Sequence, residues 1–435
     1  MAQEDTQLAT APRGGLTVVD KLRLLLDITK KISRSLDVEE VVNLVMDTLD
    51  QLLPYDAAGI YLVECAPGAD GQCMPSALKK FSKTAVRGYD IEEMSELHLK
   101  VGEGLIGHVA KTGEPLIVAD VQLDSRYVNA RRETRSEMVA PIVSNDEVIG
   151  VFDLESDEPN VYDADDLEVL TLLASQVAIA IEKAMLYDHS MERKRLQAQL
   201  EVARQVQLQL LPPRDPQLPD FDISAYNFST EEVSGDYYDF VNIYDDHLGL
   251  VIADVSGKGV PAALLMSFLR ASLRAAIHIG YAPNVAMGKV NYLLWESIET
   301  HQFVTAFYGV LDATNKTLAY ANAGHNPPVL IDADGKARFI ERGGIPLGMF
   351  RDTRYYEYYV PIESGQTLVL YTDGATEAAS PDGCEYGRDR FEQRVRDGRH
   401  LPARDLIKSL HEDILEWTGG RGSGDDVTFV VVKAI

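Results

Sequence analysis

The apolar positions near the N-terminus of the chain follow the spacing of helices before they change to that of a strand. Apolar residues recur every three or four positions between residues 22 and 32, which predicts an amphipathic helix. A second helix is predicted over residues 41–52, because Asp37 and Glu40 stand ahead of it at the spacing of a capping box. The run AAGIYLVE at residues 57–64 then predicts a strand.

A hairpin and a very long helix are predicted next. The segment MVAPIVSNDEVIGVFDLES, residues 138–156, predicts two strands joined by a turn at Asn145 and Asp146. No Gly or Pro occurs between Ala164 and Leu211, and the four prolines of LPPRDPQLPD then end the helix. Two parts of the helix keep a spacing of three to four residues, which predicts a parallel coiled coil and a homodimer. The alternative is a helix that packs only against its own domain. The seam residues are Leu170, Ala174, Val177, Ile181 and Ala184 in the first part, and Leu196, Leu200, Ala203, Val206 and Leu210 in the second.

Strands and helices are mixed beyond the prolines. Strands are predicted at residues 222–228, 247–254, 304–311, 317–321, 366–372 and 426–433. Helices are predicted at residues 260–278, 283–299, 387–397 and 403–416. This order favours antiparallel sheets with helices packed outside them over a regular βαβ repeat. We therefore expect the α/β (α+β) class, with a disordered N-terminus (1–16), a first domain (17–187), a linker helix with its proline stop (188–215) and a second domain (216–435).

The composition of the chain says more about which partners the protein can bind than about its fold. The 435 residues carry a net charge of −27, from 68 acidic and 41 basic residues, so nucleic acid and anionic membrane are disfavoured because both would be repelled. No apolar run approaches the roughly 20 residues of a membrane span, and the polar start MAQEDTQLATAPRGG lacks the regions of a signal peptide. The three cysteines lack metal-site spacing, so a disulfide scaffold is not expected and a cytoplasmic protein is.

Residues 22–187 resemble a GAF sensor domain. The resemblance rests on VGEGLIGHVAKTGEPLIVADV, on the hairpin described above and on YDADDLEVLTLLASQVAIAIEKA. It implies a fold and leaves the ligand unknown, because the Asn-Lys pair of the cyclic-nucleotide binders is absent. His108 is either a ligand contact or a capping or surface histidine. Cys65 and Cys73 have no basic neighbours that would lower the pKa of their thiols, so both are expected to be inert.

Aspartates recur in the second domain beside turns and strand ends. They are Asp236, Asp254, Asp373 and the pair Asp425 and Asp426. Taken singly, each suits a turn. Three of these sites, however, adjoin the strongly apolar runs LGLVIAD, TLVLYTD and DVTFVVV, and strand ends can meet at one edge of a sheet. Carboxylates gathered there would repel one another unless cations neutralised them. Oxygen ligands without His or Cys favour Mg²⁺ or Mn²⁺, and two such ions can activate water and hold a phosphoryl group.

Residues 195–435 resemble the PPM family of metal-dependent protein phosphatases, in its SpoIIE-like, RsbU-like bacterial branch. The motifs VSGDYYDF, ADVSGKGVPAALLM, NAGHNPP, GGIPLG, LYTDGATEA and GSGDDVTFVVV occur in the family's order. The resemblance implies a serine/threonine phosphoprotein phosphatase with two Mn²⁺ or Mg²⁺ ions and a metal-activated water as nucleophile. It implies that Asp254 bridges the ions beside the Val255 carbonyl, that Asp373 and Asp426 complete one site, and that Asp236 serves the other.

Three further features of these motifs bear on the site. Gly257 and Gly259 are expected to let the chain turn tightly from the strand into the next helix. Lys258 between them is either solvated or a substrate contact. His325 in NAGHNPP is either a general acid or a residue that structures its loop. No Arg stands where the eukaryotic relatives place their phosphate-binding Arg, and the bacterial branch generally lacks it too.

The leading hypothesis is a signal-regulated phosphatase that acts on a phosphorylated partner protein, an anti-anti-sigma-type antagonist if the family habit holds. Two alternative functions of other classes are also considered. A catalytically silent adaptor would bind the same partner, but the full set of metal carboxylates argues against it. A GAF-linked nucleotide cyclase would also place two metals on aspartates, but the 18-residue spacing of Asp236 and Asp254 and the TDG and GDD motifs argue against it.

Overall fold

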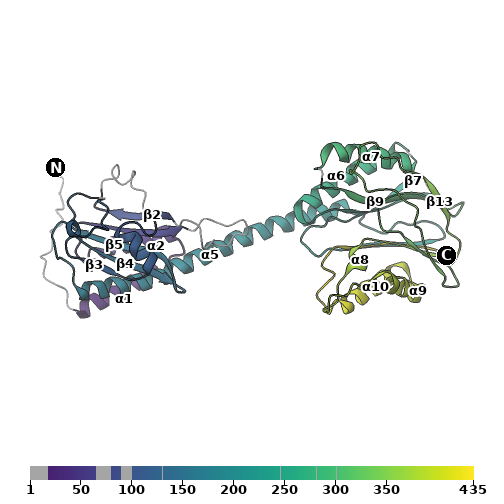
Figure 1. The fold of residues 1–435 in the computed structure, drawn as a ribbon. Helices are drawn as coiled ribbons and strands as arrows, with labels where there is room; N and C mark the ends of the chain where they lie inside the picture. The colour runs from purple at the N-terminus through teal and green to yellow at the C-terminus, as the bar shows by residue number, and fades with distance from the viewer. Residues whose placement is uncertain are drawn as a thin grey trace, which may run out of the picture. The chain divides into compact units, whose positions relative to one another are not determined.

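The computed structural model describes residues 18–64, 80–89, 100–129, 131–244, 246–280, 282–299 and 301–435. The N-terminus predicted to be disordered lies outside these residues, as do Cys65 and Cys73, which are expected to be inert. The chain separates into two compact units, Met1–Arg195 and Leu196–Ile435. One helix, α5, runs through the boundary between them (Figure 1).

The first unit is a five-stranded antiparallel sheet with helices on both faces. The strand order is β2-β1-β5-β4-β3. The strands are β1 (Ala57–Glu64), β2 (Lys80–Arg87), β3 (Leu116–Val118), β4 (Ser136–Ser144) and β5 (Glu147–Ser156). The helices are α1 (Val18–Ile32), α2 (Val38–Leu49), α4 (Gly104–Thr112), the short 3₁₀ helix η1 (Val121–Leu123) and α5 (Ala164–Leu210). Helices α1, α2 and the first part of α5 bury the core on one face, and α4 covers the other.

Two local predictions for this unit are confirmed. Asp37 is the N-cap of α2, and its side chain accepts a hydrogen bond from the Glu40 amide at 2.9 Å. Asn145 and Asp146 form the turn between β4 and β5 with φ of 49° and 64°. Asn and Asp tolerate this left-handed conformation better than most residues, which is why the pair marks a hairpin turn.

The predicted coiled-coil seam is wrong for the first part of α5. Its residues pack into the core of their own unit instead of facing solvent: Leu170, Ala174, Val177, Ile181 and Ala184 are each 0–1% exposed. The periodicity was therefore that of a core helix. Leu172, Ile179 and Leu186 form a different line, seven residues apart, and their side chains are 46%, 63% and 63% exposed. In the second part, Leu196 and Val206 are also exposed, at 55% and 56%.

Helices α5 and α6 (Gly259–His278) each contain a stretch long and apolar enough, by length and composition, to cross a membrane. This corrects the expectation that no such run exists. The stretches are 44% and 33% buried inside the protein. Core helices of proteins that never enter a membrane can be equally long and apolar. Both of these helices pack an apolar face into the core of their own unit.

The second unit has four layers: helices, sheet, sheet and helices (Figure 1). One antiparallel sheet has the order β13-β10-β9-β8-β7 and the other β12-β11-β14-β15-β6. The strands are β6 (Phe221–Phe228), β7 (Tyr237–Tyr244), β8 (His247–Val255), β9 (Val304–Asp312), β10 (Thr317–Ala323), β11 (Val329–Ile331), β12 (Ala337–Phe339), β13 (Tyr358–Pro361), β14 (Thr367–Tyr371) and β15 (Val427–Ala434). Besides α6, the helices are α7 (Pro283–Ser297), α8 (Gly374–Glu377), α9 (Arg388–Gly398) and α10 (Ala403–Trp417).

Each pair of neighbouring layers in this unit shares an apolar core. Helices α6 and α7 pack on the first sheet, α9 and α10 pack on the second, and a third core fills the space between the sheets. The six strands and four helices predicted for this unit are confirmed with ends within two residues, as is the antiparallel arrangement with outer helices. Strand β7 was not predicted, because its sequence YYDFVNIY places polar residues where a buried strand is expected to be apolar.

Candidate metal centre

The ends of four strands bring the predicted metal carboxylates to one edge of the second unit. Tyr237, the first residue of β7, pairs with Ala253 of β8, so Asp236 and Asp254 stand side by side one position further on. In the second sheet, Tyr371 ends β14 and pairs with Phe429 of β15. Because the strands are antiparallel, the residues after β14 lie beside those before β15. Asp373 and Asp426 are these residues.

Asp236 is the most deeply buried of these carboxylates, with 3% of its surface exposed. Its Oδ2 accepts hydrogen bonds from the hydroxyls of Thr372, at 2.8 Å, and Thr428, at 2.5 Å. Burial, and next the charge of Asp254, raise the pKa of Asp236 well above its usual range. These two hydroxyls are neutral donors, so they offset only part of the cost of burying the charge of Asp236.

Asp254 lies half-buried at the end of β8 among other acids. Burial raises the pKa of its carboxyl to about 7, and the charges of Asp373 and Asp425 add to the effect. Burial and Asp425 also raise the pKa of Asp373. Carboxylates close enough to raise one another's pKa destabilise the fold at neutral pH unless a cation is bound among them.

Asp426 fastens the loop before β7 to the start of β15. Its Oδ1 accepts hydrogen bonds from the amide of Thr230 at 2.8 Å and from its hydroxyl at 3.2 Å, and its Oδ2 accepts one from the Gly235 amide at 3.2 Å. The Val255 carbonyl faces the same loop, since a Cβ placed on Gly235 would lie 3.1 Å from that oxygen. The carbonyl that the family resemblance pairs with Asp254 is therefore next to Asp236 as well.

The turn after Asp254 explains the glycines of the SGKG motif. Gly257 and Gly259 have φ of 95° and 71°, a conformation that favours glycine, and α6 begins at Gly259. Lys258 between them is half-exposed and contacts the loop before β15. Its Nζ donates to the Gly424 carbonyl at 2.7 Å and forms an ion pair with Asp425 at 3.1 Å.

His325 occupies a buried loop position with 4% of its surface exposed. Its Nδ1 lies 2.8 Å from the Thr305 hydroxyl, and Thr305 pairs with Asp254 across β8 and β9. The Asn322 side chain bridges the amide and the carbonyl of His325. Burial lowers the pKa of the imidazole to about 3, so at physiological pH it is neutral and lacks the acidic proton of an imidazolium that a general acid would donate. Of the two roles considered for His325, the structure supports the loop-structuring one.

Asp239, which belongs to the same VSGDYYDF stretch, has a separate structural role. Its fully buried carboxylate accepts hydrogen bonds from Arg274 of α6 at 2.6 and 2.8 Å. It also accepts from the Tyr237 hydroxyl at 2.6 Å and from the Phe240 amide at 2.8 Å. Because β7 alternates its side chains between its two faces, Asp239 points into the core beneath α6.

The donor set at the strand ends fits hard divalent cations. All donors are oxygens: Asp236, Asp254, Asp373 and Asp426 could offer carboxylates and Val255 a carbonyl. Among the residues that the structure describes, tight sets of three ligand atoms within 4.8 Å occur elsewhere in the chain and not here. The carboxylates of this centre are thus more widely spaced than those compact clusters.

The sequence analysis missed several residues that support this centre. They are Thr372 and Thr428, Asn227, which donates to Thr428, and Gln207 near the end of α5. The Gln207 amide donates to the Ser234 carbonyl at 2.6 Å and its oxygen accepts from the Ser234 amide at 2.9 Å. The two threonines could have been found as hydroxyls one or two residues from a motif aspartate. Nothing in the sequence indicates the partner of Gln207, 27 residues away.

The fold and the site define a two-domain protein, in which a module with one antiparallel sheet and helices on both faces precedes a four-layer sandwich with an acidic centre at one edge. Residues 35–182 match the family model of the GAF domain, and residues 244–435 match that of Stage II sporulation protein E (SpoIIE). The chain therefore joins a GAF domain to a phosphatase domain of the SpoIIE/PP2C type, which confirms both resemblances noted in the sequence.

Relatives of known structure or activity agree with this assignment. Phosphoserine phosphatase RsbU of Bacillus subtilis is 28% identical over 242 residues, which cover 55% of this chain and 71% of RsbU. Phosphoserine phosphatase RsbP of the same organism is 27% identical over 239 residues, covering 54% of this chain and 57% of RsbP. The SiaA-PP2C domain of Pseudomonas aeruginosa shares the fold, with a TM-score of 0.51, 23% identity, and coverage of 56% of this chain and 98% of that domain.

Proposed function

We propose that the second unit is a metal-dependent phosphatase that removes phosphate from serine or threonine of a partner protein. The observation that carries the proposal is the convergence of four strand-end carboxylates, Asp236, Asp254, Asp373 and Asp426, in a domain of the SpoIIE/PP2C type. Divalent cations bound there would supply an activated water and offset the charge of the phosphoryl group. We propose that the centre holds two Mn²⁺ or Mg²⁺ ions, for which Asp254 would be the shared ligand and the Val255 carbonyl a ligand beside it.

The residues around the centre are proposed to position its carboxylates. Thr372 and Thr428 orient the Asp236 carboxylate through their hydroxyls, and Asp426 ties the loop before β7 to β15. Lys258 holds Asp425 at the rim, where that carboxylate would otherwise repel an incoming phosphate. These contacts keep the carboxylates in place before substrate arrives, which lowers the reorganisation that catalysis would otherwise require.

The substrate is proposed to be a phosphoserine or phosphothreonine protein, and an anti-anti-sigma-type antagonist in particular. RsbU and RsbP are named phosphoserine phosphatases, which supports the phosphoserine part of the proposal. The carboxylates of Asp254, Asp373 and Asp426 are only partly buried. A side chain on the surface of a folded protein can therefore approach them without entering a deep pocket.

Protein contacts are expected to dominate substrate recognition. We expect kcat/KM for the phosphorylated antagonist to exceed that for p-nitrophenyl phosphate by at least about a hundredfold, since about 3 kcal/mol of binding to the protein surface would suffice. Steady-state kinetics with Mn²⁺ on both substrates measures this ratio. Similar values on both would contradict a dedicated protein substrate. Binding of the phosphorylated protein without turnover of either substrate would favour the silent adaptor.

We also propose that the protein is a homodimer and that α5 carries the signal between its domains. Three exposed apolar residues at heptad spacing, Leu172, Ile179 and Leu186, form a line that a second copy of the helix would cover. The same helix ends at the metal centre, where Gln207 holds both backbone groups of Ser234, two residues before Asp236. A rotation of the helix would therefore act on the Asp236 loop.

One extra residue inserted after Ser190 is expected to change activity or its regulation sharply, because it rotates the rest of α5 by about 100°. Phosphatase assays and sedimentation measure the outcome, and the dimer is expected to persist. The matched control inserts seven residues, which return the helix to within about 20° of its original phase and should keep activity near wild type. A monomeric wild-type protein, or a single insertion without effect, would reject the coupling.

A further inference from the structure

Three acidic side chains lie buried together on the α4 face of the sheet in the first unit. Glu137 belongs to β4, and Asp153 and Glu155 belong to β5; they are 2%, 0% and 2% exposed. Glu137 pairs with Glu155 across the two strands, and Asp153 stands two positions from Glu155 on the same face. One carboxylate oxygen from each of the three lies within 4.8 Å of the other two. The sequence analysis predicted these two strands but did not predict that their acidic residues would be buried together.

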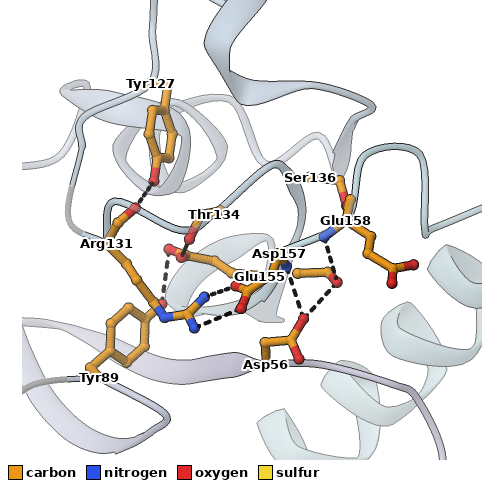
Figure 2. A network of polar contacts seen from close by, with 10 residues as sticks. Asp56, Tyr89, Tyr127, Arg131, Thr134, Ser136, Glu155, Asp157 and Glu158 are labelled. Atoms are coloured by element: carbon orange, nitrogen blue, oxygen red, sulfur yellow. Dashed lines mark hydrogen bonds and ion pairs between the residues drawn. The ribbon is translucent and has the colours of Figure 1, made fainter.

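Among the described residues, few hydroxyl groups reach these carboxylates, and Glu137 and Asp153 also hydrogen-bond to each other. The Tyr89 hydroxyl lies 2.7 Å from Asp153 Oδ2 and 3.0 Å from Glu155 Oε1, and it has one proton to share between them. The Thr134 hydroxyl donates to the other oxygen of Glu155, as Figure 2 shows. Asp153 Oδ1 is fully buried and has no hydrogen-bond partner. A buried acceptor of this kind is costly to leave unpaired.

The charge of Arg131 lowers the pKa of Glu155, but within the described residues no ion pair joins this guanidinium to any of the three acids. Arg131, the nearest guanidinium, is engaged by both oxygens of Asp157 (Figure 2). Within the described ranges, no ion pair reaches Glu137, Asp153 or Glu155. The N-terminus of α4, which lines the same space, contributes about half a positive charge at most. When the three acids are ionised, the positive charge beside them therefore does not balance their own.

A small cavity lies against the acids. Its walls include all three carboxylates, the rings of Tyr61, Tyr89 and Tyr127, and the first residues of α4. Its volume is about 20 Å³, which suffices for roughly one water-sized group. The space therefore combines three acceptors, aromatic walls and room for a single small group.

We propose that this cavity binds the primary ammonium group of a small organic cation. An ammonium carries three N–H donors for the three acids, and the tyrosine rings attract its positive charge. A hard divalent ion is less suitable, because such ions usually retain several waters and the cavity has no room for them. The aromatic walls would add nothing to the binding of a hydrated metal ion. The site belongs to the first unit and does not depend on the phosphatase proposal.

The titration of the acids supports the same ligand. Burial, and next the neighbouring acids, raise the pKa of Glu137 and Asp153 well above their usual range, and burial raises that of Glu155. A bound cation must displace the protons held there, so binding is expected to tighten as pH rises and to release protons. The other charged or titratable groups around the cluster are Arg131, Asp157, Asp56, Asp124, Tyr61, Tyr89, Tyr127 and Tyr162. The pKa of each of these four tyrosines is raised by burial, so they stay neutral over this range.

The test titrates the full-length protein with methylammonium chloride at constant ionic strength and about pH 8, where the acids are the most ionised. We expect a saturable rise in Tm, and calorimetry in buffers of different ionisation enthalpy should show proton release. Glu137→Gln and Asp153→Asn should each weaken binding at least about tenfold, since each removes a charged hydrogen bond. Both variants are expected to fold, because loss of one acid relieves repulsion.

The matched control is Glu158→Gln, which removes an exposed acid next to the cluster and should bind methylammonium like the wild type. Tetramethylammonium, MgCl₂, MnCl₂ and CaCl₂ form the other arms of the titration. A saturable shift with a metal ion that Asp153→Asn abolishes, without one for methylammonium, would make this a metal site and overturn the proposal. Equal effects of methylammonium and tetramethylammonium, or no saturable shift in any arm, would overturn it too.

Discussion

Asp254→Asn is expected to lower phosphatase turnover at least about a hundredfold at saturating Mn²⁺, while the protein remains folded. The loss follows from the removal of the carboxylate proposed to lie between the two ions, which weakens the ion that activates water. Assays on both p-nitrophenyl phosphate and the phosphorylated partner measure the effect. Substantial turnover by purified Asp254→Asn protein would sink the two-metal proposal.

The same variant has a second readout that does not depend on activity. The pKa of Asp254 is raised to about 7 in the folded metal-free protein, above the 3.8 of the free side chain. A group of this kind contributes stability at low pH that is lost as pH rises between those values. Metal-free wild type should thus be less stable above pH 7 than below pH 4 as far as this group is concerned, and Mn²⁺ should offset that loss.

Asp254→Asn is expected to remove both parts of this behaviour. Without metal it should unfold at a Tm at or above that of the wild type near neutral pH, because the repulsion with Asp373 is gone. Its Tm should rise less with Mn²⁺ than that of the wild type. Asp389→Asn, at an exposed position of α9, is the matched control and should leave both activity and the Mn²⁺ effect unchanged.

Arg274→Ala is expected to lower the free energy of unfolding of the second unit by about 3 kcal/mol, since it leaves the fully buried Asp239 carboxylate without its partner. This value is the lower end of the usual range, because the Arg274 side chain is 34% exposed. For a unit of this size, the Tm should fall by roughly 10 °C. Thermal unfolding and denaturant titration of the full chain both report the change.

Two companion variants make the Arg274 result specific. Arg270→Ala, one turn earlier on α6, removes a guanidinium that pairs with no carboxylate among the described residues and should cost less than about 1 kcal/mol. The double variant Asp239→Leu/Arg274→Ala should recover part of the lost stability, since it buries no unpaired charge. A loss from Arg274→Ala no larger than that from Arg270→Ala would contradict the structural role of the pair.

Much of the second unit could be predicted because its signals are local. An apolar run that ends in Asp, as in LGLVIAD and TLVLYTD, indicates both a buried strand and the position of its end. Antiparallel pairing brings the ends of β14 and β15 together, which places Asp373 near Asp426. Asp254 lies in the other sheet, and grouping it with them rested on the family resemblance. The short strands β11, β12 and β13 and the polar β7 gave no such signal, because pairing with neighbours rather than their own composition makes them strands.

The sequence could not decide between two structures where the same residue pattern is compatible with both. The spacing of Leu170, Val177 and Ile181 suits a coiled coil and a core helix equally, and only the sheet packed against α5 shows that the core uses these residues. Asp236 and Asp239 flank the same tyrosine pair, yet one faces Thr372 and Thr428 while the other faces Arg274. Which partner each meets depends on residues far away along the chain.

The sequence by itself determined the two-domain order, the strands and helices with strong periodicity, and the set of aspartates at the strand ends. These features depend on contacts within a few residues or on apolar runs that must be buried, and such signals can be read from the sequence alone. The tertiary structure alone decided that Gln207 supports the loop before Asp236, that Lys258 is held by Asp425, and that Glu137, Asp153 and Glu155 form one buried cluster. Each of these contacts joins elements whose approach is set by the packing of whole layers, and no local pattern encodes that approach.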